Sequence, residues 1–107
     1  MTINDPTRDA QPQNPPHPYA DRMTALARSF PSLRGMAGVS PWRPAALAAR
    51  VPTMSHGEAC AARFVLEVWA GGSYPDVARF DLVEALQCWD RKHQEAAAAF
   101  VRAPWWP

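Results

Sequence analysis

The side chains best suited to chemistry in this sequence are two cysteines and the histidines near them. His56, Cys60 and Arg63 follow one another at spacings of four and three residues. On a helix this spacing places an imidazole one turn before the thiol and a guanidinium one turn after it. A helix N-terminus and cationic neighbours both favour the thiolate form of cysteine. Cys60, with His56 and Arg63, is therefore the candidate reactive thiol, and it implies a redox or sensor role. A structural, half-buried cysteine is the competing interpretation.

Metal binding is the second chemistry that these residue types suggest. His56, Cys60, Cys88 and His93 carry the donor atoms that tetrahedral zinc prefers. His56 and Cys60 have one-turn spacing, but Cys88 and His93 are five residues apart, about 140° around a regular helix. The sequence therefore predicts that the second pair faces two different sides, and we expect no metal or cofactor. His93 is interpreted as a buried side chain that donates to Asp90.

Sequence signatures of catalysis are absent from the chain. It has no phosphate-binding glycine loop, no dinucleotide-binding glycine pattern, no nucleophile elbow and no paired metal carboxylates. We therefore expect a protein that is not an enzyme.

The elements that would position these side chains are helices, and the longest periodic segment runs from Asp81 to Ala103. Its apolar stripe comprises Leu82, Leu86, Trp89, His93, Ala96 and Phe100. The alternating spacings of four and three residues predict one amphipathic helix of about 22 residues. Asp81 is expected to cap it.

Residues 55–70 form the second strong helix of the prediction. Ser55 and Glu58 make a capping box at its start, and Gly71 ends it. We expect this helix to pack antiparallel against 81–103. Shorter helices are predicted over 21–30, capped by Asp21, and over 44–50. The predicted fold is a small all-α domain.

The chain begins with a segment of different composition. Residues 1–20 contain five prolines among polar side chains, so we predict an extended tail followed by a single domain over 21–107. Two cysteines are too few for a small secreted disulfide scaffold, and no apolar run resembles a signal peptide or a membrane span. These features predict a cytoplasmic protein with reduced thiols. Ten arginines against one lysine favour a GC-rich bacterial or phage coding sequence.

Charge is distributed unevenly, although the net charge is only +1. Residues 22–57 hold five basic side chains and no acidic one: Arg22, Arg28, Arg34, Arg43 and Arg50. Residues 58–107 hold five basic and seven acidic side chains, a balance of −2. We expect the two halves to attract each other within or between chains, since a duplex-binding domain usually has a larger positive charge. Nucleic-acid binding through the five arginines is the alternative.

Tryptophans supply the leading functional hypothesis, which is a protein-binding or adaptor module. Trp105 and Trp106 form an aromatic C-terminal hook, and Trp42 anchors a glycine- and proline-rich loop. We expect Trp105 to point inward and Trp106 to remain accessible. The partner is a second protein or another copy of the chain, because a core this small is commonly supplemented by self-association.

Overall fold

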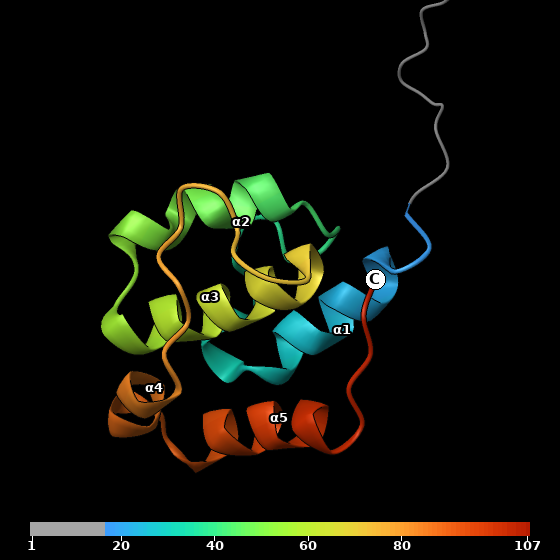
Figure 1. The fold of residues 1–107 in the computed structure, drawn as a ribbon. Helices are drawn as coiled ribbons and strands as arrows, with labels where there is room; N and C mark the ends of the chain where they lie inside the picture. Colours follow the sequence, from blue (N-terminus) through green and yellow to red (C-terminus); the bar gives the residue numbers. More distant parts are fainter. Residues whose placement is uncertain (1–16) are drawn as a thin grey trace, which may run out of the picture.

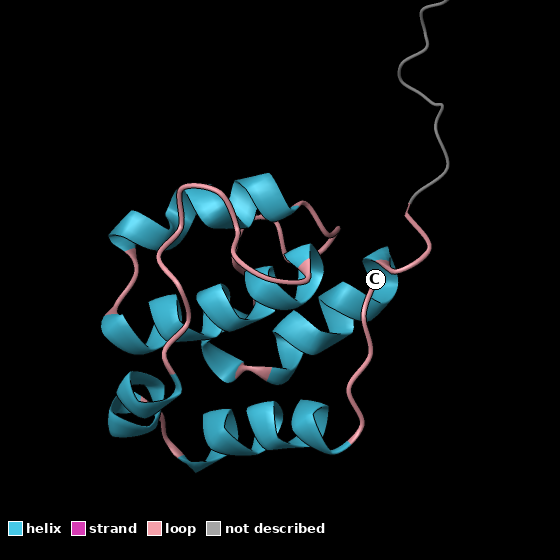
Figure 2. Cartoon of the chain, in the orientation of Figure 1, coloured by secondary structure: helices cyan, strands magenta, loops and turns pink. Residues whose placement is uncertain are grey.

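The computed structural model describes residues 17–107, so our expectation for the first 16 residues lies outside it. This part of the chain contains α1 (Ala20–Ser29), η1 (Pro31–Leu33), α2 (Pro44–Arg50), η2 (Val51–Thr53), α3 (His56–Ala70), α4 (Leu82–Cys88) and α5 (Arg91–Arg102) (Figure 1). No strand occurs in the described residues (Figure 2). The predicted all-α class is confirmed.

Helix α1 begins at Ala20, one residue before the predicted cap. Its N-cap is Tyr19, which makes no side-chain capping bond, so Asp21 lies within the first turn instead. There its negative charge still interacts favourably with the positive end of the helix dipole. The predicted apolar face is buried and consists of Met23, Leu26, Ala27 and Phe30.

Helices α2 and α3 follow the local signals of the sequence closely. Ser55 Oγ accepts a hydrogen bond from the Glu58 N–H at 3.3 Å, and Glu58 Oε1 accepts one from the Ser55 N–H at 2.9 Å. These two bonds are the predicted capping box, and they satisfy backbone donors that the helix leaves unpaired. Gly71 ends α3 in the left-handed conformation with φ of 71°. Helix α2 spans Pro44–Arg50, as predicted.

The predicted helix over 81–103 is two helices, which corrects the expectation of one continuous element. Trp89 and Asp90 adopt extended backbone angles, with ψ of 140° and 179°. The Asp90 carboxylate accepts a hydrogen bond from the His93 N–H at 3.0 Å and so caps α5. Trp89 stays buried, and its indole N–H donates to the Gly57 carbonyl at 3.1 Å. The cap and the buried indole together favour the break.

The break also changes which side of α4 faces the core. Ala85 is fully buried, whereas Leu82 and Leu86 of the predicted stripe are 55% and 48% exposed. The second half of the stripe is buried as predicted, at Trp89, His93 and beyond. Because the chain changes direction at Trp89 and Asp90, the seven-residue α4 need not bury the face that a continuous helix would bury.

The arrangement of the long helices differs from the predicted antiparallel pair. Helix α1 packs against both α3 and α5, and α3 packs against α4. In Figure 1, α3 and α5 run in the same general direction and α1 runs opposite to both. The segment 71–81 makes this possible because it returns along the length of α3 before α4 begins. Phe30, the C-cap residue of α1, contacts both α3 and Trp89, with its ring centroid 5.7 Å from that of Phe64 and 5.5 Å from that of Trp89.

His93 has the structural role that the sequence predicts. It is 9% exposed, and its Nδ1 lies 2.8 Å from the Asp90 carboxylate. Its Nε2 accepts from the Ser32 N–H and lies 2.8 Å from the Ser32 hydroxyl. An accepting Nε2 places the ring proton on Nδ1, which therefore donates to Asp90. These bonds from His93 lower the pKa of Asp90 below its usual range.

Candidate functional site

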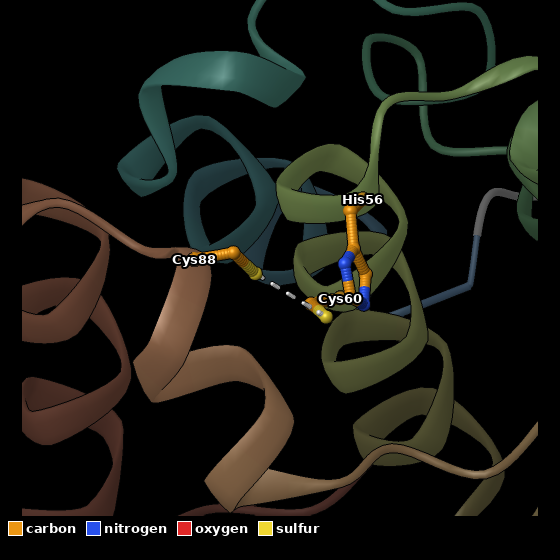
Figure 3. Close-up of side chains that lie close together, drawn as sticks. All are labelled: His56, Cys60 and Cys88. Atoms are coloured by element: carbon orange, nitrogen blue, oxygen red, sulfur yellow. Dashed lines mark hydrogen bonds between the residues drawn. The ribbon is translucent and has the colours of Figure 1, made fainter.

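Three potential ligand side chains converge where the start of α3 meets the end of α4. His56 and Cys60 lie one turn apart on α3, and Cys88 is the last residue of α4 (Figure 3). The Cys60 and Cys88 sulfurs are 3.9 Å apart. One ligand atom from each of the three residues lies within 4.8 Å of the other two. Cys60 is buried, and His56 and Cys88 are exposed, so the cluster opens to solvent on one side.

A carboxylate and a guanidinium border this cluster. Glu84, one turn before Cys88 on α4, contacts the His56 Nε2 through its Oε2. Arg63 Nη1 lies 3.7 Å from the same oxygen. Arg63 Nε is buried and has no hydrogen-bond partner among the described residues. The site therefore combines two sulfurs, an imidazole and a carboxylate with one nearby positive charge.

Burial determines the protonation of Cys60 in this setting. Desolvation, followed by the hydrogen bond and charge of the neighbouring Cys88, raises the pKa of Cys60 to about 11, and Arg63 lowers it only partly. This direction is opposite to the one expected from the helix N-terminus and the adjacent cations. At neutral pH the Cys60 thiol keeps its proton, which disfavours a nucleophilic role.

Two of the three members of this cluster were predictable from the sequence. The one-turn spacing brings His56 and Cys60 together, whereas the helical periodicity of 81–103 predicts an outward-facing Cys88. That placement assumed a continuous helix over 81–103, whereas the break after Cys88 and the return of the chain along α3 bring its sulfur to Cys60. His93 is not part of the cluster because its ring is committed to Asp90 and Ser32.

The two C-terminal tryptophans are placed as predicted. Trp105 is half-buried, stacks on Tyr19 at 6.0 Å between ring centroids, and has the Arg22 guanidinium 4.4 Å from its ring centroid. Trp106 is 57% exposed and meets Phe100 with one edge. The hook therefore has one residue packed on the domain and one free for contact.

Trp106 borders a largely apolar pocket in the described part of the chain. This pocket has a volume of about 460 Å³ and lies between the end of α3, the segment before α4 and the end of α5. Its aromatic wall comprises Phe64, Phe80, Phe100 and Trp106. At its polar edge Arg79 Nε donates to Glu67 at 2.8 Å. We refer to it below as the aromatic pocket.

Trp42, the third tryptophan of the binding hypothesis, lies in the core. It is 8% exposed and packs edge-on against Trp69, 5.7 Å away between centroids. Trp42 therefore anchors its loop, as predicted, and is not accessible to a partner.

The basic residues of the nucleic-acid alternative are all exposed. Arg22 and Arg28 lie on α1, Arg34 follows η1, and Arg43 and Arg50 stand at the two ends of α2. None of the five forms an ion pair with a carboxylate of residues 17–107, so the expected attraction between the two halves is not seen there as salt bridges.

One further surface was not anticipated from the sequence. Leu82, Val83 and Leu86 are 55%, 67% and 48% exposed on α4. None of the described helices has the length and apolar character needed to cross a membrane.

Comparison with known proteins adds no assignment: no family model, curated protein or solved structure matches this chain.

Proposed function

We propose that the protein is a non-enzymatic protein-binding module whose aromatic pocket holds an extended, proline-rich segment of a partner. The observation that carries the proposal is the exposure of Trp106 beside a pocket walled by three phenylalanines. An accessible tryptophan next to a pocket of this size and composition is typical of a site that another molecule covers.

The aromatic side chains that line the pocket favour a proline-rich segment as its occupant. Proline-rich segments hold a polyproline II conformation with little entropy left to lose, and they dock between aromatic side chains. The chain itself offers such a segment, since residues 1–16 contain Pro6, Pro12, Pro15 and Pro16. The described chain enters beside the pocket region, because Tyr19 stacks on Trp105 and Trp105 meets Phe100. A peptide of residues 1–16 is therefore the appropriate probe.

The test measures binding of that peptide to a chain that begins at His17, which retains every described helix. We expect saturable binding that protects Trp106 from iodide quenching. Trp106→Ala should abolish binding. Val83→Ala, which truncates an even more exposed apolar side chain outside the pocket, should not. Circular dichroism checks that each variant is folded.

Two results would contradict the proposal. Equal binding of a control peptide with all four prolines replaced by alanine would show that the pocket does not recognise proline. Peptide binding that survives Trp106→Ala would place the contact elsewhere on the chain.

Nucleic-acid binding is the second candidate, favoured by the exposure of the five arginines and the absence of ion pairs to them among residues 17–107. Polyanion binding through these side chains would weaken steeply with added salt. Replacing Arg34, Arg43 and Arg50 together by alanine should abolish it. A salt-insensitive interaction, or no interaction with duplex DNA at low salt, would remove this candidate.

A further inference from the structure

We propose that His56, Cys60 and Cys88 bind one zinc ion in a tetrahedral site, with the Glu84 carboxylate as the fourth ligand. This site is separate from the aromatic pocket: it lies at the start of α3, whereas the pocket lies at its end. The proposal does not depend on the protein-binding function.

The spacing of the donor atoms fits the metal. Two thiolates about 2.3 Å from a tetrahedral zinc ion are separated by roughly 3.8 Å. The Cys60 and Cys88 sulfurs are 3.9 Å apart, and a His56 ligand atom lies within 4.8 Å of both. Only small side-chain movements are therefore needed to bring the three donors to one ion (Figure 3).

The identity and charge of the donors select zinc. Sulfur and imidazole ligands favour zinc over magnesium or calcium, which prefer oxygen. The sulfurs bind as thiolates and their protons leave to solvent. Two thiolates, one carboxylate and Zn²⁺ sum to a charge of −1. Arg63, with its Nη1 3.7 Å from Glu84 Oε2, balances that charge.

The two helices explain how the ligands are held and what the ion would do. His56 and Cys60 are fixed by the capped first turns of α3, and Glu84 and Cys88 are one turn apart on α4. His56 and Cys60 thus face the site from one helix, and on the other helix Cys88 is joined by Glu84, whose carboxylate contacts the His56 ring. The ion would fasten α4, whose apolar side is largely exposed, to the start of α3.

The first experiment titrates the reduced full-length chain with Co²⁺, which reports on zinc sites through its spectrum. We expect one equivalent to produce the visible bands of tetrahedral cobalt together with thiolate-to-cobalt charge transfer, and Zn²⁺ to displace it. Zn²⁺ should also raise the melting temperature of the reduced chain. These readouts need no substitution, so they decide the question even where a variant does not fold.

Variants then assign the ligands. Cys60→Ser and Cys88→Ser should each weaken zinc binding by more than about 100-fold, beyond the 10–100-fold cost of losing an outer-shell partner. Glu84→Gln should weaken it by at least about tenfold. Glu95→Gln, which removes an exposed carboxylate paired with Arg91 on α5, is the matched control and should change nothing.

Three results would overturn the proposal. The first is an octahedral cobalt spectrum without thiolate charge transfer. The second is undiminished zinc affinity in Cys88→Ser. The third is a fully reduced chain, with any Cys60–Cys88 disulfide removed, that binds neither Co²⁺ nor Zn²⁺.

Discussion

Gly38 offers the sharpest test of how the loop between α1 and α2 is held. It has φ of 90°, and a Cβ built there would lie 2.5 Å from both the Arg43 carbonyl oxygen and the Leu47 nitrogen. Both are backbone atoms, so a side-chain rotation cannot relieve the overlap. The Gly38 carbonyl also accepts from the Arg43 N–H at 2.7 Å, which ties the loop to the start of α2. Gly38→Ala must therefore displace α2 or break this turn.

Gly35 provides the matched control for this substitution. It has φ of 82°, but a Cβ there would meet nothing within 4 Å. Gly35→Ala should cost only the left-handed backbone strain, about 1–2 kcal/mol. Gly38→Ala bears the same strain plus an overpacking cost of about 1–3 kcal/mol. Urea unfolding followed by circular dichroism gives both free energies. Equal losses in the two variants would refute the reasoning, because they would show that α2 does not crowd Gly38.

Two further substitutions and one accessibility measurement test the remaining structure. Ser55→Ala removes the cap of α3 and should lower the free energy of unfolding by ~1 kcal/mol, measured by urea denaturation; an unchanged value would place the start of α3 elsewhere. Trp89→Ala should cost ~3–5 kcal/mol in the same assay, because the indole is buried and bonded to Gly57. Iodide should quench the indole at Trp106 far more than the one at Trp105, as single Trp→Phe substitutions would reveal; equal quenching would contradict the exposure difference.

Helix ends that depend on local chemistry were predictable from the sequence. The capping box of α3, the left-handed Gly71 and the proline at the start of α2 each act within a few residues, so neither tertiary context nor chain direction alters them. The buried face of α1 was also predictable from a local pattern. Its apolar residues recur at helical spacing within a short segment bounded by Pro31.

The break between α4 and α5 could not be predicted from helical periodicity alone. The stripe from Leu82 to Phe100 continues across it in phase, which indicates one helix. The contrary signal was Asp90, a strong N-cap residue that stands three positions before His93. Whether such a residue caps a new helix or remains exposed within a longer one depends on tertiary packing. Here the buried Trp89 indole and its bond to Gly57 favour the cap.

One member of the side-chain cluster, Cys88, could not be placed from the sequence. A pair on one helix, such as His56 and Cys60, is visible as a spacing in the sequence. The approach of Cys88 depends instead on the direction in which α4 leaves the segment 71–81, and no local pattern states that direction. The aromatic pocket is similar, because its walls come from α3, the segment before α4 and the C-terminal end.

A single carboxylate on α3 holds the chain segment that leads to both proposed sites. Glu67, near its C-terminal end, accepts from Arg79 Nε at 2.8 Å and from the Phe80 N–H at 2.7 Å. These bonds fix the segment that returns along α3, and Phe80 then forms part of the wall of the aromatic pocket. Asp81 follows at once and caps α4, which brings Cys88 to Cys60. The position of the pocket wall and the approach of α4 to His56 and Cys60 on α3 therefore depend on the same anchor.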